Sequence, residues 1–140
     1  MGLLIAPALS LAVAIGITGC ASPLPAPDPQ MAWVDLSADG INTFMSDRLD
    51  GKRTPDGRYF QVSPGAHELE ARYEFEISSG GSGDFGDTHY LRCTMVIHYD
   101  DFQPGRRYLF QARALGFTPQ GWLRDEQNQV LARAEAEHCY

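Results

Sequence analysis

The sequence predicts an all-β fold, either a single antiparallel β-sandwich or a small barrel-like domain. Apolar and polar residues alternate with a period of two in two long segments, and Pro and Gly turns separate several short apolar segments. No amphipathic helical pattern follows the apolar N-terminal segment. Because each predicted strand has one apolar side, the strands must pack in layers that bury these sides.

The clearest strand covers residues 67–78, in which apolar side chains mostly occupy the odd positions and charged side chains the even positions. Residues 91–99 alternate in the same way. When the two are aligned across their glycine-rich connection, apolar residues face apolar residues and Glu74 faces Arg92, a favourable pair. A shift of one residue would bury carboxylates, so we expect this register. It pairs Phe75 with Leu91, Tyr73 with Cys93, Ala71 with Met95 and Leu69 with Ile97.

Shorter strands are predicted on both sides of this hairpin. They cover residues 32–36, 43–45, 59–62, 107–115, 121–125 and 130–133. We expect 107–115 to extend the hairpin into a three-stranded meander with the same inner layer. Pro64-Gly65 fits the middle of a type II turn, which predicts a second hairpin that begins with 59–62. The last two segments predict an edge pair, with a short helix over 130–137 as the alternative.

The N-terminus is apolar, carries no charge up to residue 27, and contains Ile17-Thr18-Gly19-Cys20. A small residue before a cysteine at the end of an apolar segment resembles the lipobox of bacterial lipoproteins. The resemblance implies that residues 1–19 are a signal peptide and that Cys20 is acylated and becomes the first mature residue. Because Ala21 follows, it also implies an outer-membrane lipoprotein that faces the periplasm. An uncleaved membrane anchor is the alternative for this segment.

Residues 20–30 contain the cysteine and then four prolines, at positions 23, 25, 27 and 29. Proline fixes φ and has no amide hydrogen, so we expect an extended tether of about 30 Å, outside any sheet. Residues 31–140 have the length of one domain and, with Asp28, carry the whole formal charge of −7. Such an acidic domain disfavours nucleic acid and anionic lipid headgroups as partners, and it is compatible with a cationic partner or a metal.

Lipidation of Cys20 would leave Cys93 and Cys139 as the two remaining cysteines. In the oxidising periplasm, we expect them to form a disulfide. Closing this long loop would stabilise the fold by about 4 kcal/mol on the chain-entropy model. A redox-active or metal-binding thiol is the alternative, although neither cysteine lies in a C-x-x-C motif.

The segment from Val62 to Ala71, VSPGAHELEA, contains a Pro-Gly-x-His motif, and Asp50-Gly51-Lys52 precedes it. Both features resemble segments of PEGA-type β-sandwich modules of bacterial envelope proteins, with the Asp-Gly pair as a turn. The resemblance implies a β-sandwich with a non-catalytic structural or interaction role. The residues after Tyr90 have no counterpart in it.

Two groups of residues are candidates for binding. In the expected hairpin, His98, Glu68 and Glu70 share the outer face, where imidazole and carboxylates could hold zinc or copper. Because these ligands are few, we expect neither a metal nor a cofactor. The acidic connection between the two long strands places Phe85 between Asp84 and Asp87, and we consider these three residues a candidate partner contact. This connection precedes a strand rather than a helix, which disfavours a phosphate site, and it lacks the ligands of a calcium loop.

Catalytic motifs are absent from the sequence. Ser63 lies near His67, but no G-x-S-x-G motif is present, and Asp100-Asp101 is typical of a turn. We therefore expect no enzyme but a structural or protein-interaction role in an envelope assembly. The expected partners are the membrane, through the lipid, and an envelope protein. A small-ligand or metal-binding lipoprotein is the alternative.

Overall fold

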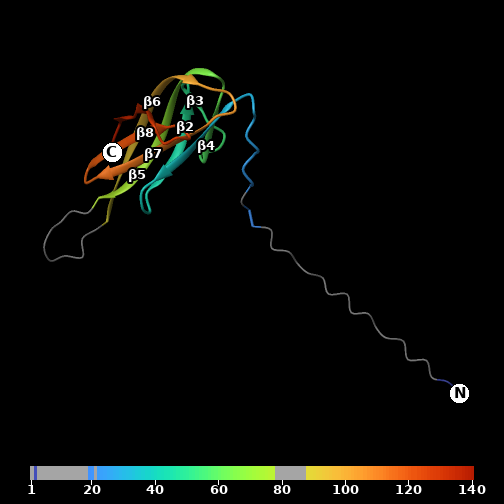
Figure 1. The fold of residues 1–140 in the computed structure, drawn as a ribbon. Coiled ribbons are helices and arrows are strands. Elements are labelled where there is room, and N and C mark those ends of the chain that lie inside the picture. Colours follow the sequence, from blue (N-terminus) through green and yellow to red (C-terminus); the bar gives the residue numbers. More distant parts are fainter. Residues whose placement is uncertain (1, 3–18, 21, 78–87) are drawn as a thin grey trace.

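The computed structural model describes residues 2, 19–20, 22–77 and 88–140 (Figure 1). These residues contain ten strands and no helix, so none of them belongs to an apolar helix long enough to cross a bilayer. Most of the predicted signal peptide lies outside the described residues.

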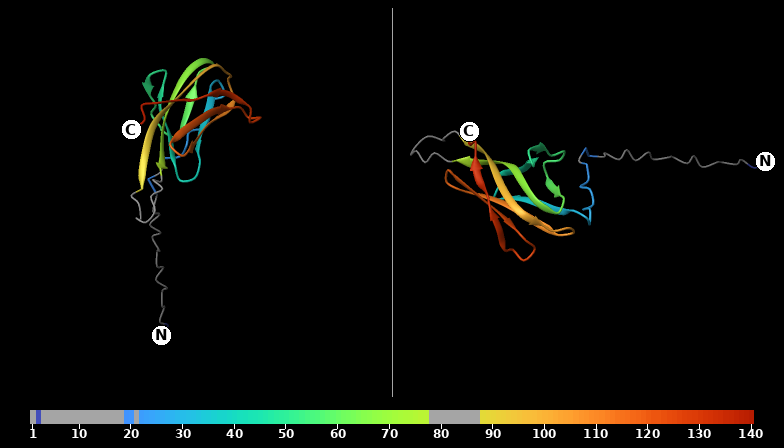
Figure 2. Two further views of the ribbon diagram at one scale, coloured as in Figure 1. Left: turned by 90° about the vertical axis from the view of Figure 1, so that its left-hand side faces the viewer. Right: turned by 90° about the horizontal axis from the view of Figure 1, so that it is seen from above.

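The strands form two five-stranded sheets that pack face to face (Figure 2). The strands are β1 (Ala32–Ala38), β2 (Thr43–Leu49), β3 (Lys52–Arg53), β4 (Tyr59–Val62), β5 (Gly65–Ile77), β6 (His89–Phe102), β7 (Arg107–Leu115), β8 (Thr118–Arg124), β9 (Val130–Arg133) and β10 (Glu135–Glu137). The β1 sheet has the order β4-β1-β7-β8-β9, and the β5 sheet has the order β10-β6-β5-β2-β3. The predicted all-β sandwich is confirmed, and the sheets do not close into a barrel.

The long hairpin has the predicted register. β5 and β6 are antiparallel, all four predicted apolar pairs lie opposite each other, and Glu74 lies opposite Arg92. The Arg92 Nε donates to the Glu74 carboxylate at 2.8 Å. The inward residues of both strands from Leu69 to Phe75 and from Cys93 to Ile97 are buried, because alternation assigns them to the core side.

The predicted meander was wrong, because β7 does not join this hairpin. It crosses to the other sheet and pairs in parallel with β1, with Trp33 opposite Arg107 and Leu36 opposite Phe110. Its predicted inward residues Tyr108, Phe110 and Ala112 are nevertheless buried, facing β5 and β6 from the opposite layer. An alternating strand buries its apolar side in either sheet of a sandwich, so the pattern predicts the face and not the sheet.

The second predicted hairpin was also wrong, since β4 pairs with β1 and the Pro64-Gly65 turn carries the chain between the sheets. Gly65 has a φ of 108°, a conformation that favours glycine. The edge pair of β8 and β9 is confirmed, with Trp122 opposite Arg133. The helical alternative over 130–137 is excluded, because β10 pairs with β6 and continues the β5 sheet.

Aromatic side chains join the two sheets. Phe110 of the β1 sheet meets Phe44 of the β5 sheet edge to face, with ring centres 4.8 Å apart. Phe102 and Tyr108 pack in the same way at 5.1 Å. Such contacts bury large apolar area and fix the packing of the layers.

The tether reaches β1 at one end of the sandwich. Residues 22–28 belong to no strand, as predicted, and they contact the domain, since Arg58 donates to the Ser22 carbonyl at 2.9 Å. β1 and β7 are parallel, so both strands finish at the opposite end, which we call the distal end (Figure 1). The β1–β2 turn (residues 39–42) and the β7–β8 turn (residues 116–117) form part of it.

Candidate functional site

The two predicted cysteines are joined. Cys93 and Cys139 form a disulfide, and Cys93 is fully buried in the core. Beside it, the backbones of Arg92 and Tyr140 exchange hydrogen bonds of 3.0 and 2.9 Å. The disulfide therefore fastens the C-terminus along β6. Cys20, the predicted lipidation site, is a free and exposed thiol among the described residues.

The predicted metal candidates form a pair rather than a cluster. His98 Nε2 lies 3.4 Å from Glu68 Oε2, as expected for opposite residues. Glu70 lies on the same face, and burial, together with a hydrogen bond to Glu68, raises the pKa of its carboxyl. No group of three His, Cys, Asp or Glu residues in the described part of the chain is arranged to hold a metal.

The predicted partner-contact residues Phe85, Asp84 and Asp87 lie outside the described residues. The strands that flank them, β5 and β6, have their nearer ends at Ile77 and His89, which lie opposite each other.

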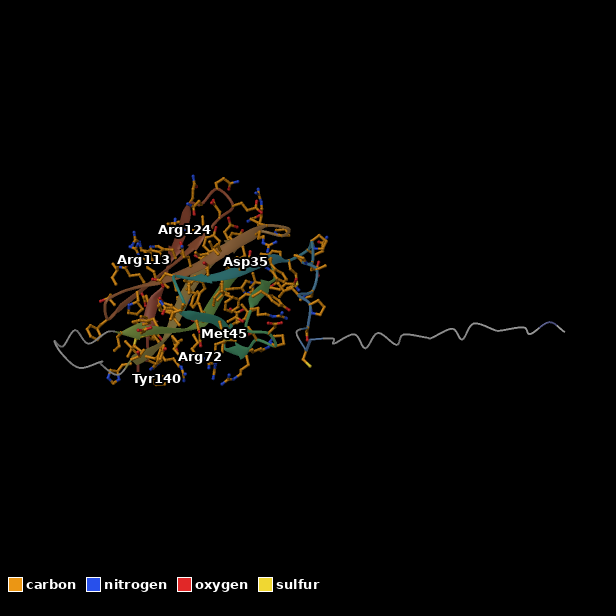
Figure 3. All side chains as sticks on the ribbon, turned by 90° about the horizontal axis from the view of Figure 1, so that it is seen from below. Asp35, Met45, Arg72, Arg113, Arg124 and Tyr140 are labelled. Carbon is orange, nitrogen blue, oxygen red and sulfur yellow. A yellow bond between two sulfur atoms is a disulfide. The ribbon has the colours of Figure 1, made fainter. Side chains whose placement is uncertain are left out.

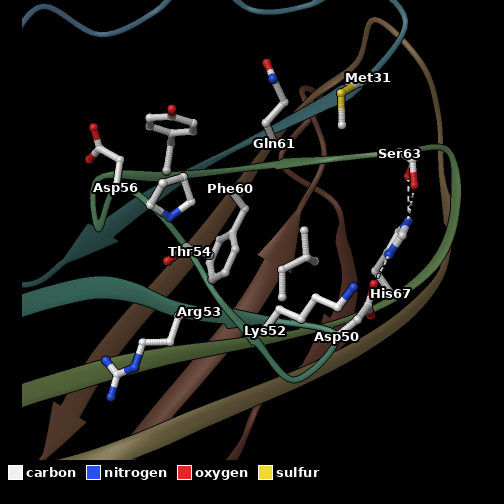
Figure 4. Close-up of a pocket in the computed structure, with 13 residues that line it drawn as sticks. Met31, Asp50, Lys52, Arg53, Thr54, Asp56, Phe60, Gln61, Ser63 and His67 are labelled. Atoms are coloured by element: carbon white, nitrogen blue, oxygen red, sulfur yellow. Dashed lines mark hydrogen bonds and ion pairs between the residues drawn. The ribbon is translucent and has the colours of Figure 1, made fainter.

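His67 joins three segments of the chain. Sequence analysis considered its neighbour Ser63 but not its contact with Asp50. His67 Nδ1 lies 2.6 Å from Asp50 Oδ2, while Nε2 lies 2.7 Å from the Ser63 carbonyl oxygen and 3.1 Å from Ser63 Oγ. The other Asp50 oxygen accepts the Glu68 amide at 2.8 Å. This amide and the His67 contact lower the pKa of the Asp50 carboxyl. The two segments of the PEGA resemblance, around Asp50 and His67, thus meet in space (Figure 4).

These residues line a groove of about 420 Å³ that also contains Lys52 and Arg53. The geometry suits a structural bridge better than a hydrolytic triad. A carbonyl oxygen only accepts hydrogen bonds, so the 2.7 Å contact requires Nε2 to donate, and it cannot then take the Ser63 proton. Pro64 follows Ser63 and has no amide to stabilise an oxyanion there.

A basic surface that sequence analysis missed covers part of the β1 sheet. Seven arginines of the chain contact carboxylates. Arg113, Arg124 and Arg133 form no ion pair with any described carboxylate, and all three lie around Trp122. They line an open groove of about 520 Å³, which we call the arginine groove. Its lining consists of Gln111, Arg113, Gln120, Trp122, Arg124, Val130 and Arg133.

The side chains of this groove hold one another in place. The guanidinium carbons of Arg113 and Arg124 lie 5.0 and 5.8 Å from the centre of the Trp122 ring. The Arg113 Nε donates to Gln120 at 3.2 Å, and the Arg124 Nε donates to Gln111 at 3.1 Å. Arg133 lies directly opposite Trp122 on the edge strand β9.

The arginine groove and most of the glutamates lie on different sheets (Figure 3). Arg113 and Arg124 lie on the outer face of the β1 sheet, and Arg72 lies on the opposite side of the molecule. Most glutamates belong to the β5 sheet, at positions 68, 70, 74 and 76 on β5 and 135 and 137 on β10. The alternation of β7 and β8 contains the signal for the basic face, because their outward positions hold the arginines and Trp122.

Exposed apolar side chains gather at the distal end. Ile41, Leu115 and Phe117 are 82%, 54% and 65% exposed, and we call them the distal cluster. Ile41 and Phe117 belong to the β1–β2 and β7–β8 turns, and Leu115 is the last residue of β7. The two turns adjoin, because Asn42 and Phe117 line one small hollow. Sequence analysis missed all three residues, because a turn residue has no periodicity that reports its exposure and the alternation of β7 does not reveal which residues lie next to Leu115.

Asp39 fixes these turns against the core. Its carboxylate accepts hydrogen bonds from Tyr73 Oη at 2.7 Å, from Asn42 at 2.9 Å and from the Ala114 amide at 3.5 Å. Although burial opposes the charge, the bonds from Tyr73 and Asn42 lower the pKa of Asp39. These bonds thus hold the β1–β2 turn, which carries Ile41, against Tyr73 and against Ala114 of β7.

In comparisons with known proteins, no family model, no curated protein and no solved structure matches this chain.

Proposed function

We propose that this protein is a lipid-anchored, non-catalytic interaction domain of an envelope assembly. In this proposal, Cys20 carries the lipid and holds the protein in the outer membrane, facing the periplasm. The domain binds a partner protein through its distal end. The observation that carries the interaction role is the exposed distal cluster of Ile41, Leu115 and Phe117.

Single apolar residues are common on protein surfaces, but neighbouring exposed ones favour contact with a partner. The distal cluster lies on the β1–β2 turn, at the end of β7 and on the turn that follows it, and the Asp39 carboxylate ties the β1–β2 turn to Tyr73 and to the Ala114 amide of β7 in the free domain. A partner would therefore bury its apolar area without ordering a loop first, which lowers the entropic cost of association.

The position of the tether supports the same role. It enters the domain at the end opposite the distal cluster (Figure 1). A lipid at Cys20 would leave the distal cluster directed away from the tether attachment and free to meet an envelope protein. The expected partner surface is apolar, because the distal cluster contains no charge.

The test is photo-crosslinking in native membranes, with a photoreactive amino acid in place of Thr118, which follows the β7–β8 turn. We expect a crosslinked partner of defined mass. In the Ile41→Ser/Phe117→Ser variant, the loss of two apolar contacts should weaken binding about tenfold or more and abolish the crosslink. The matched control is Met45→Ser, which removes an apolar side chain that is 45% exposed on the β5 sheet. No crosslink in the unaltered protein, or an undiminished one in the double variant, would refute the proposal.

The alternative function, binding of a small ligand, has one observation in its favour, the arginine groove. That groove lies on the outer face of the β1 sheet and is lined by none of the residues of the distal cluster. Its role can therefore be tested separately.

A further inference from the structure

We propose that the arginine groove is a binding site for an anionic glycan, an oligosaccharide or polysaccharide that carries carboxylate groups. The inference goes beyond the proposed function and does not depend on it, because the groove and the distal cluster share no residue. It rests on the charge, the hydrogen-bonding capacity and the composition of the groove.

The charge of the groove is uncompensated. The chain carries a net charge of −7, and its other arginines contact carboxylates, yet Arg113, Arg124 and Arg133 contact none that the structure describes. Like charges that share one groove repel each other. An anionic ligand would relieve this repulsion, and it would be attracted by two or three cations at once.

The guanidinium groups are arranged to accept such a ligand. Arg113 and Arg124 each donate a hydrogen bond from Nε to a glutamine of the groove, and both guanidinium groups lie near the Trp122 ring. Their side chains are therefore held in place before any ligand binds. The terminal nitrogens of Arg113 form no hydrogen bond with the described residues. A guanidinium with free terminal N–H groups binds a carboxylate through two parallel hydrogen bonds. Prior ordering lowers the entropic cost of binding.

The composition of the groove suits a glycan. Val130 is the single aliphatic residue among the seven that line it, so the groove offers mainly polar groups and one aromatic ring to a ligand. Two amides, three guanidinium groups and one indole ring offer hydrogen bonds to hydroxyl groups as well as to carboxylates. The groove is open rather than enclosed, so a chain of sugar units could pass across it.

Binding can be measured by isothermal titration of the full chain, purified in detergent. The probe is oligogalacturonate, a carboxylated oligosaccharide, and a neutral oligosaccharide of equal length is its control. We expect binding of oligogalacturonate alone, weakened by added salt because the charges are exposed. Arg113→Gln/Arg133→Gln should reduce the affinity about tenfold or more.

The matched variant is Arg48→Gln/Arg53→Gln, which removes the same charge from the β5 sheet and should leave the affinity unchanged. Far-ultraviolet circular dichroism of both variants reports whether the fold is kept. The affinity of Arg113→Lys, which preserves the charge but not the paired N–H groups, gives a second measure of the guanidinium's contribution to binding.

Lack of binding by oligogalacturonate, or equal losses of affinity in the two double variants, would overturn the proposal. Equal affinity for polyglutamate would indicate an acidic protein ligand, and equal affinity for inorganic phosphate would indicate an unspecific anion site. Either result would also overturn it.

Discussion

His67 links three parts of the fold through one side chain. Its ring contacts Asp50 in the β2–β3 turn and Ser63 before β5, and its backbone belongs to β5. Asp50 itself has a φ of 49°, a conformation that Asp and Asn tolerate better than most residues. The sequence placed Asp50 and His67 in separate motifs. Their contact could not be predicted, because it depends on how the β2–β3 turn folds over β5.

Replacing Asp50 with Asn tests this bridge at the residue scale. The substitution keeps the backbone conformation but removes the charge that faces His67, so the free energy of unfolding should fall by about 1 kcal/mol at pH 7. The folded state lowers the pKa of Asp50 below 3.8. The contribution of Asp50 to the free energy of unfolding is therefore complete above pH 3.8, and it is lost as the pH falls through the pKa of the folded state.

Denaturant titration at pH 7 and near pH 3 measures both effects. The difference between the two proteins should shrink at the lower pH. Asp100→Asn, an exposed position with no side-chain hydrogen bond among those described, serves as the control and should change little. An equal loss at both pH values would contradict an electrostatic bridge.

At the scale of the elements, the register of the β5–β6 hairpin was predictable, although β6 extends beyond the predicted range at both ends, and the partners of β7 were not. A shift of one residue would bury carboxylates, and the observed alignment places Glu74 opposite Arg92 and Tyr73 opposite Cys93, as predicted. For β7, alternation predicted the buried residues Tyr108, Phe110 and Ala112 but not the sheet to which the strand belongs. A turn between β6 and β7 can return the chain to the same sheet or lead it across the core, and alternation is the same in both cases.

The C-terminal strand β10 ends two residues before the disulfide-bonded Cys139. It has three residues, all exposed, and it pairs with β6. We expect Cys139→Ser to lower the free energy of unfolding by about 2–4 kcal/mol and to release β10 from β6.

Hydrogen exchange of the amides of β10 and thermal unfolding measure these two effects. Cys20→Ser is the matched control, because it removes a thiol that is exposed and forms no disulfide. It should leave the hydrogen exchange of β10 and the thermal unfolding of the domain unchanged. Unchanged protection of β10 in Cys139→Ser would show that strand pairing alone holds the C-terminus.

At the scale of the whole molecule, the net charge of −7 concealed a separation of charges. Composition was compatible with a cationic partner or a metal, but the sandwich places most glutamates on the β5 sheet, and on the β1 sheet it places three arginines that pair with no described carboxylate. The arginine groove can be recognised only when the outward residues of β7, β8 and β9 are taken together, which requires the pairing of these strands to be known. The distal cluster likewise becomes visible only when two turns that are distant in the sequence meet at one end.

In the proposed arrangement, the two binding surfaces belong to a domain that is held by its N-terminus. The distal cluster lies opposite the tether, and the arginine groove lies on a face formed by β7, β8 and β9. A lipid-anchored protein could therefore contact a partner protein and a glycan at the same time, since the two surfaces are separate. The role of the distal cluster in an envelope assembly assumes that the chain is exported and attached to the membrane, whereas binding at the arginine groove can be tested without that assumption.

Attachment through Cys20 is thus the claim on which the account depends most. The direct measurement is labelling of growing cells with radioactive palmitate, followed by purification of the protein from separated membranes and mass analysis of its N-terminal peptide. We predict a labelled protein in the outer membrane whose first residue is acylated Cys20, and no label in Cys20→Ser. An unlabelled protein, or one that retains residues before Cys20, would contradict the account.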